Sequence, residues 1–189
     1  MSRLLIPVAL LVALVGINTL TRHVRDRQPA PAPSSARSAW LASPYTLDPF
    51  TVKDLEGREL SSAAWAGQVA VINFWATWCL PCRREIPALV ALQERYKGRA
   101  IVVGVIDDNA GDDVIRRFAA NLQINYPIVR TSLELTRRFP SVEALPMTVL
   151  VDPRGRVSVA YAGEVNAAEL EQDLLKLLAI STRAAAPQG

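Results

Sequence analysis

Hydrophobic positions between residues 45 and 180 follow two alternating patterns. Short apolar runs bounded by polar or turn residues predict strands, namely Val69–Trp75, Ile101–Ile106, Met147–Val151 and Arg156–Tyr161. Apolar residues that recur every three or four positions predict helices, namely Leu80–Tyr96, Asp112–Leu122, Leu133–Arg138 and Ala167–Ala179. Two segments before the first strand, Tyr45–Val52 and Arg58–Leu60, predict a small hairpin around Glu56-Gly57. This alternation predicts a mixed α/β sandwich.

A different pattern precedes this domain. Leu4–Leu20 is a run of 17 uncharged, mainly apolar residues. As a helix it would be about 25 Å long, at the short end for a hydrocarbon core of about 30 Å. No small-x-small cleavage site follows it directly. We therefore expect residues 1–21 to be an uncleaved membrane anchor, and a cleaved signal peptide is the alternative. More Arg follow the run than precede it, so the positive-inside rule alone argues against export of the domain.

Composition divides the remaining chain into a tether, a domain and a tail. Residues 22–44 are rich in Pro, Ala and Ser, which is typical of a disordered tether. We expect residues 45–180 to form the domain and residues 181–189 to form a flexible tail. Residues 1–44 carry five Arg and one Asp, whereas the domain carries 15 Lys or Arg and 17 Asp or Glu. The basic pI therefore belongs to the N-terminal segment and gives no support for nucleic-acid binding.

Two cysteines, Cys79 and Cys82, carry the strongest chemical signal in the chain. They are too few for a disulfide scaffold, and a Cys-x-x-Cys pair beside a β-α pattern is typical of a redox site. Free N–H groups and the helix dipole at the predicted helix start favour a thiolate at Cys79. The thiolate is the species that attacks a disulfide. Cys82 lies one turn further on, where it can reach Cys79 and release a bound partner.

The residues around the cysteines resemble the TlpA/ResA branch of the thioredoxin superfamily over about residues 45–179. The resemblance rests on the run Val71–Cys79, on Pro81-Cys82-Arg83-Arg84-Glu85 and on Leu145-Pro146 before a strand. It implies a thioredoxin-like three-layer sandwich, with helices on both faces of a central mixed sheet and an N-terminal β-hairpin. It also implies that Pro146 is cis and shapes a groove for the substrate backbone beside the cysteines, and that Pro87 kinks the helix.

Further side chains are expected to surround the cysteines. Pro81 suits the first helical turn, where no N–H is needed, and Trp78 is expected to cover the site beside the exposed sulfur. Leu80 and Leu145, with Thr77, are expected to contribute to the choice of client.

The resemblance also assigns roles to two polar residues. Asn73 stands where cytosolic thioredoxins carry a buried aspartate, and Glu85 matches a glutamate that the TlpA/ResA family often uses. Glu85 could accept or deliver the proton of Cys82 during exchange. The alternative is an exposed first-turn acid that pairs with Arg83 or Arg84. No histidine lies between the cysteines, which favours a reductant over a strong oxidant.

The resemblance implies a periplasmic or otherwise extracytoplasmic domain, held at the bacterial inner membrane by a single N-terminal helix. A membrane thiol reductase would supply electrons, and the clients would be proteins with a disulfide or cysteine pair, as in cytochrome c maturation. The redox-active pair Cys79–Cys82 would be the only redox centre, with no further cofactor and no metal.

Other functions stay open at this point. A structural disulfide or a zinc site would use the same cysteines, but zinc needs about four ligands and the one histidine is His23. Covalent haem attachment needs a histidine where Arg83 stands. A thiol peroxidase shares the broader fold, although Asn73 and Ala76 do not fit its usual pattern. A non-catalytic module that binds copper or a client is the third alternative. Asp107-Asp108 and Asp112-Asp113 predict a solvated loop and a helix cap.

Overall fold

The structure, a computed structural model, describes residues 38–139 and 142–185. The predicted anchor and the tether up to residue 37 lie outside the described residues, as do residues 186–189. Within the described ranges, no helix is long and apolar enough to span a bilayer.

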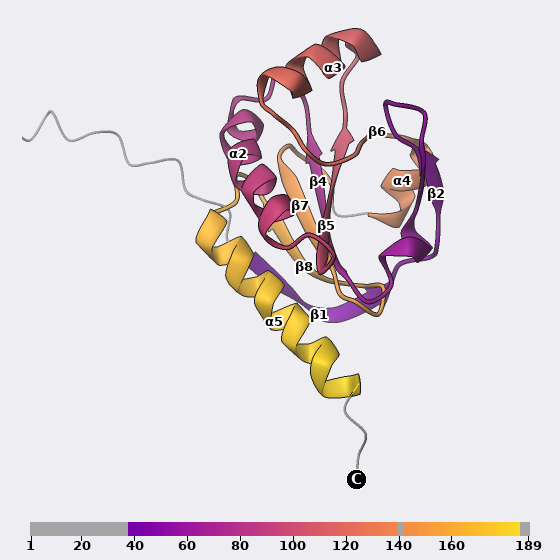
Figure 1. Ribbon diagram of the computed structural model, residues 1–189, viewed down its shortest axis with the longest axis vertical. Helices are drawn as coiled ribbons and strands as arrows, with labels where there is room; N and C mark the ends of the chain where they lie inside the picture. Colours follow the sequence, from indigo (N-terminus) through magenta and orange to yellow (C-terminus); the bar gives the residue numbers. More distant parts are fainter. Residues whose placement is uncertain (1–37, 140–141, 186–189) are drawn as a thin grey trace, which may run out of the picture. The chain divides into compact units, whose positions relative to one another are not determined.

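A six-stranded mixed sheet forms the centre of the domain (Figure 1). Its order is β1-β8-β7-β4-β5-β6. The strands are β1 (Ser38–Thr46), β4 (Val69–Trp75), β5 (Ala100–Ile106), β6 (Ile128–Arg130), β7 (Met147–Val151) and β8 (Arg156–Ala162). The pairs from β4 to β6 are parallel, and those from β1 to β4 are antiparallel. All seven residues of β4 are buried, because β4 lies between two strands and both faces of the sheet are covered.

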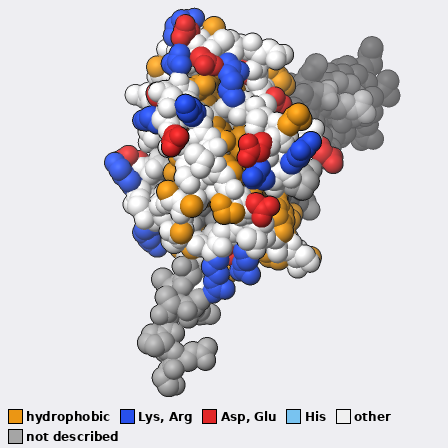
Figure 2. Space-filling model, turned by 90° about the vertical axis from the view of Figure 1, so that its right-hand side faces the viewer, with side chains coloured by type: hydrophobic (Ala, Val, Ile, Leu, Met, Phe, Trp, Pro, Cys, Tyr) orange, Lys and Arg blue, Asp and Glu red, His pale blue; other side chains and the backbone are white. Residues whose placement is uncertain are grey.

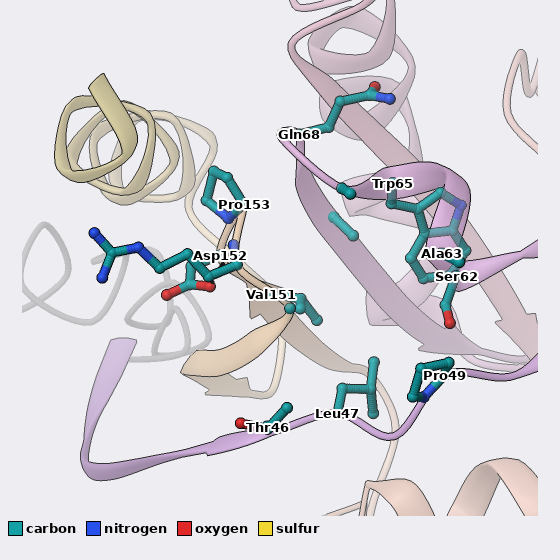
Figure 3. A pocket seen from close by; sticks show the side chains of 14 residues that line it. Thr46, Leu47, Pro49, Ser62, Ala63, Trp65, Gln68, Val151, Asp152 and Pro153 are labelled. Atoms are coloured by element: carbon teal, nitrogen blue, oxygen red, sulfur yellow. Dashed lines mark hydrogen bonds between the residues drawn. The ribbon is translucent and has the colours of Figure 1, made fainter. Parts of the chain in front are cut away.

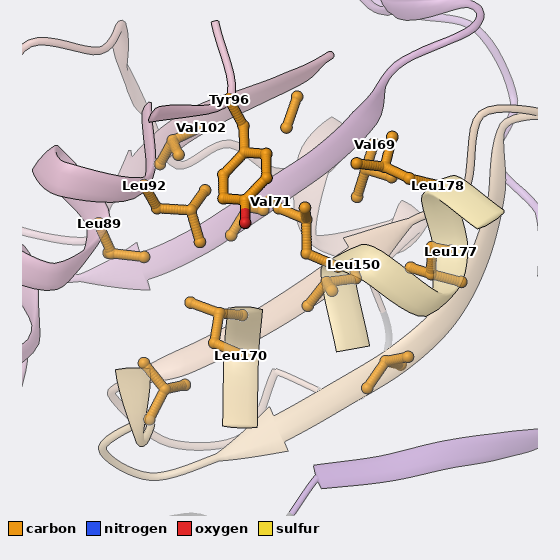
Figure 4. Close-up of a cluster of buried hydrophobic side chains, with 14 of the residues drawn as sticks. Val69, Val71, Leu89, Leu92, Tyr96, Val102, Leu150, Leu170, Leu177 and Leu178 are labelled. Carbon is orange, nitrogen blue, oxygen red and sulfur yellow. The ribbon is translucent and has the colours of Figure 1, made fainter. Parts of the chain in front are cut away.

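Helices and short elements cover the two faces of this sheet. The helices are α2 (Leu80–Arg95), α3 (Asp112–Asn121), α4 (Leu133–Arg138) and α5 (Ala167–Ala185). One face packs against α2 and α5 through apolar side chains that include Leu89, Leu92, Leu170 and Leu177 (Figure 4). The other face packs against α4, the 3-10 helix η1 (Ser62–Trp65) and the hairpin segment. The predicted three-layer α/β sandwich is therefore confirmed.

The N-terminal boundary of the domain differs from the prediction. The sequence predicts that the tether continues to residue 44, whereas β1 begins at Ser38 and pairs with β8. Trp40 explains this start, because its Nε1 donates a hydrogen bond to Asp173 on α5 at 3.1 Å and its ring lies 5.7 Å from Lys176 Nζ. The Pro- and Ala-rich composition concealed a strand whose partners lie more than a hundred residues away.

Three other elements differ from the predicted boundaries. The hairpin consists of β2 (Thr51–Lys53) and β3 (Glu59–Ser61), while Tyr45 belongs to β1. The short strand β6 is missing from the prediction, since three residues carry too little periodicity. The last helix continues to Ala185 instead of ending before the predicted tail at residue 181.

Charged side chains of both signs lie on the face that carries β2 and α4 (Figure 2). Several of them form ion pairs there, such as Arg58 with Glu56 at 3.2 Å and Arg138 with Glu134 at 3.3 Å. Exposed pairs of this kind contribute about 0–1 kcal/mol each. The stability of the domain therefore rests on its buried apolar layers.

Gly104 offers a direct test of how tightly the layer under α2 and α3 is packed. A Cβ at this position would lie 2.8 Å from Trp75 Nε1 and 3.3 Å from Tyr126 Cε2. We expect Gly104→Ala to lower the free energy of unfolding by about 1–3 kcal/mol, because buried rings must shift. Denaturant unfolding measures this loss, with Gly111→Ala as the control, since a Cβ there meets nothing within 4 Å. Equal stability of the two variants would contradict the described packing.

Candidate active site

The cysteine pair lies where the central strand β4 passes into α2. Cys79 is the N-cap of α2, and the backbone N of Cys82 donates a hydrogen bond to its sulfur at 3.3 Å. The two sulfurs are joined in a disulfide, with Cys79 4% exposed and Cys82 fully buried. Pro81 lies in the first turn of α2, as predicted, where its missing N–H breaks no helical bond. The helix start therefore directs free N–H groups at Cys79.

The loop before β7 reaches the same end of the sheet. The Leu145–Pro146 bond is cis, as the family resemblance implies. Phe74 pairs with Met147, which places Pro146 level with the end of β4, where the chain turns toward the cysteines. Leu145 packs against the apolar cluster that contains both cysteines.

Two predicted substrate-contacting side chains stand out from this surface. Trp78 is 68% exposed and Leu80 is 63% exposed, which is unusual for large apolar residues. They flank Cys79 in the sequence, so the nearly buried sulfur has apolar groups on both sides. This exposed apolar rim fits contact with another protein.

Glu85 is buried in a hydrogen-bonded network, and the alternative of an exposed acid paired with Arg83 or Arg84 is wrong. Its Oε1 accepts a hydrogen bond from Asn73 Nδ2 at 2.7 Å, and its Oε2 accepts one from the backbone N of Val165 at 3.0 Å. Asn73 Nδ2 also donates to Thr148 Oγ1 at 2.9 Å. The network joins α2, β4, β7 and the segment after β8, which no local sequence pattern could reveal.

Burial raises the pKa of Glu85 from 4.5 to about 7. The hydrogen bonds from Val165 and Asn73 oppose this rise, and the nearby charge of Glu164 adds to it. Because Glu85 follows Cys82 by three helical positions, the two side chains share one face of α2. A buried carboxyl with a pKa near neutrality can take up or release a proton beside Cys82.

Asp108 holds the chain just before the cysteines. Its Oδ2 accepts hydrogen bonds from the backbone N of Thr77 at 2.8 Å and from Thr77 Oγ1 at 2.5 Å, and its Oδ1 accepts one from the N of Ala110. Burial raises the pKa of Asp108, but the hydrogen bonds from Thr77 and Ala110 outweigh it and hold the pKa below its usual value. Asp108 is therefore ionised at neutral pH and anchors the active-site loop.

The role of Asp108 differs from the prediction of a solvated loop. The contact spans 31 residues, and only the closeness of the ends of β4 and β5 suggests it. The predicted helix cap is also displaced: Gly111 is the N-cap of α3, and Asp112 and Asp113 lie in its first turn.

Comparison with known proteins agrees with this geometry. The model of the AhpC/TSA family matches residues 46–162. The thiol-disulfide oxidoreductase ResA of Bacillus thuringiensis subsp. konkukian is 30% identical over 129 residues, which cover 68% of this chain and 74% of that protein. This chain belongs to the AhpC/TSA family, as a ResA-type thiol:disulfide oxidoreductase.

Two further relatives of this ResA-type chain agree. The thioredoxin-like protein YneN of Bacillus subtilis is 32% identical over 127 residues, which cover 66% of this chain and 74% of that protein. A thiol:disulfide interchange protein from Chlorobium tepidum TLS is 28% identical with a TM-score of 0.64, and the match covers 72% of this chain and 98% of that one. The family resemblance predicted from the sequence is confirmed.

Other sites in this oxidoreductase are weaker candidates. Among the described residues, no group of three His, Cys, Asp or Glu is placed to hold a metal ion. A hollow of about 350 Å³ between Leu47, Trp65 and Val151 lies at the start of β4, at the opposite end of the strand from Cys79 (Figure 3). It shares no residue with the cysteine site.

Burial of Glu85 predicts a pH dependence of stability in the disulfide form. Folding raises its pKa, so its contribution to stability is full below about pH 4.5 and is lost as the pH rises through about 7. The expected loss is about 3 kcal/mol at most. Urea unfolding at pH 5 and pH 8 should show this loss in the wild type and a smaller one in Glu85→Gln. The exposed Glu94→Gln should behave like the wild type, and an unchanged loss in Glu85→Gln would contradict the assignment.

Proposed function

We propose that the chain is a membrane-tethered, extracytoplasmic reductant of protein disulfides, in which Cys79 attacks, Cys82 resolves and Glu85 exchanges the proton. The observation that carries this proposal is the place of Cys79 at the start of α2, with the N–H of Cys82 directed at its sulfur. These groups stabilise a thiolate at Cys79 once the disulfide is reduced.

The proposed cycle has two exchange steps. The Cys79 thiolate attacks one sulfur of a client disulfide, forms a mixed disulfide and releases the other client sulfur as a thiolate. Cys82 then loses its proton and attacks Cys79 Sγ, which releases the second client thiolate and forms the Cys79–Cys82 disulfide. Two electrons pass to the client, and the cysteine pair is the only redox centre that these steps use.

Glu85 fits the proton step of this cycle. A carboxyl with a pKa of about 7 is partly ionised at neutral pH, so it can accept the Cys82 proton in one direction and return it in the other. Asn73 donates to it and holds its orientation. Asp108 supports the attacking residue Cys79, because its hydrogen bonds with Thr77 hold the loop that leads to Cys79.

The client would dock across the exposed rim described above. Trp78 and Leu80 would contact apolar side chains beside the client disulfide, and the loop at Leu145-Pro146 would contact its backbone. Pro81 and the buried Cys82 lie beneath this contact. The surface fits proteins with an accessible cysteine pair, such as the apocytochromes handled during cytochrome c maturation.

Placement at a membrane rests on the apolar run Leu4–Leu20. Ser38 pairs with Tyr161, which pairs with Thr148 of the Glu85 network, so β1 starts level with the active site. A tether that precedes β1 would therefore join the domain at its catalytic end. The electron donor in this proposal is a membrane thiol reductase of the periplasmic side, as the family resemblance implies.

The reduction potential of the Cys79–Cys82 pair tests the proposed direction. The full chain would be equilibrated in dithiothreitol or glutathione buffers and its thiols counted. A potential near that of thioredoxin, about −270 mV, is expected for a reductant. A potential near that of strong oxidants, about −120 mV, would make the chain a disulfide donor instead.

A further inference from the structure

Each residue of the segment Gly163–Val165, which follows β8, forms a hydrogen bond or an ion pair with a residue at or beside the active site. The N of Gly163 donates to the carbonyl oxygen of Pro146 at 2.9 Å. Arg84 donates to Glu164 Oε2 from Nε at 2.9 Å and from Nη2 at 2.6 Å. The N of Val165 donates to Glu85 Oε2 at 3.0 Å. One short segment therefore contacts both the loop at Leu145-Pro146 and the buried carboxyl of Glu85.

The ion pair between Arg84 and Glu164 adds little to global stability. The two side chains are 49% and 26% exposed, and such pairs contribute about 0–1 kcal/mol. Their position matters more than their strength, because Glu164 immediately precedes Val165, whose N–H reaches Glu85. Arg84 also immediately precedes Glu85 on α2. The ion pair therefore links the two residues that precede the donor and the acceptor of the hydrogen bond from Val165 to Glu85.

We propose that Arg84 and Glu164 are positioning residues for proton exchange at Glu85, since their ion pair holds the Val165 N–H on the carboxyl and sets the charge beside it. The proposal rests on the proposed function, because it concerns the proton step of that cycle. It assigns a role to two partly exposed residues outside the cysteine pair.

Glu164 carries the negative charge that acts on Glu85, and Arg84 neutralises part of it through the ion pair. Asn73, which donates to Glu85 from β4, is neutral, and so is Thr148 of β7, which accepts from Asn73. Tyr126 is also neutral, because burial first and then the charge of Glu85 raise its pKa. Glu164 raises the pKa of Glu85, and Arg84 places a positive charge directly on Glu164. Arg83 lies over the ring of Phe118 at 5.6 Å, away from this pair.

Opposite shifts distinguish this role from simple loosening of the segment. Arg84→Gln leaves the charge of Glu164 without its partner and frees Val165, so the midpoint of Glu85 should rise by about half a pH unit. Glu164→Gln removes the charge but keeps an acceptor for Arg84, so the midpoint should fall by about the same amount. Loosening alone would weaken the Val165 hydrogen bond in both variants and raise both midpoints.

The test is a carbon-13 NMR titration of the Glu85 carboxyl in the disulfide form of the full chain, assigned with Glu85→Gln. Arg84→Lys should restore the wild-type midpoint, and Glu94→Gln on the exposed side of α2 should leave it unchanged. Midpoints that stay still, or that move in the same direction in Arg84→Gln and Glu164→Gln, would overturn the proposal. Exchange with a peptide disulfide is measured in parallel, because its absence in the wild type would instead refute the proposed function.

Discussion

Cys79→Ser should lower the rate of thiol:disulfide exchange by on the order of 10³-fold or more, to the uncatalysed background. Serine is nearly the same size, so the helix start and its free N–H groups remain. The hydroxyl cannot form a mixed disulfide, however, and the attacking atom is lost. Reduction of a fluorescent peptide disulfide by the pre-reduced full chain measures the rate.

Cys82→Ser is the matched variant for this prediction. It keeps the attacking thiolate but removes the sulfur that releases the client, so a mixed disulfide through Cys79 should accumulate. Mass spectrometry under non-reducing conditions detects this adduct, which should be absent from Cys79→Ser. If Cys79→Ser trapped the client and Cys82→Ser did not, the assigned order of attack would be reversed.

Glu85→Gln should slow the release step, in which Cys82 attacks the mixed disulfide, by about a hundredfold at pH 7. The amide has the size of the carboxyl but cannot take the Cys82 proton. The first step at Cys79 should change little, because the helix start activates that sulfur independently of Glu85. Stopped-flow measurement of mixed-disulfide formation and decay separates the two steps.

The control for Glu85→Gln is Glu94→Gln, an exposed carboxyl on the same helix. It should leave both steps unchanged. The pH profile provides a second check, since the release step of the wild type should titrate near the Glu85 pKa of about 7 and that of Glu85→Gln should not. Release that is equally fast in Glu85→Gln would remove Glu85 from the mechanism.

The catalytic cysteines and the strands around them were predictable because their signals are local. Val69–Trp75 is a mainly apolar run, which predicts a strand. The helix that starts after Cys79 is predicted by Pro81 in its first turn and by the spacing of its apolar residues. Strand β1 was not predictable, because Trp40 is stabilised by Asp173 across 133 positions. Its own composition resembles a linker.

The long-range contacts that support the site escaped prediction for the same reason. Glu85 could be identified from the family resemblance, but its hydrogen-bonded surroundings depend on Asn73, which also bonds Thr148 of the neighbouring strand, and on Val165 after β8. The contact of Asp108 with Thr77 depends on the parallel pairing of β4 and β5. Long-range pairings of this kind decide the proton affinity of the site.

The central claim is that the cysteine pair reduces disulfides. It is tested most directly by offering the pre-reduced full chain one equivalent of a peptide disulfide or, separately, of hydrogen peroxide. The account predicts that the peptide disulfide is consumed faster, with two peptide thiols released for each Cys79–Cys82 disulfide formed. Rapid consumption of peroxide with the peptide disulfide left intact would contradict it and indicate a thiol peroxidase.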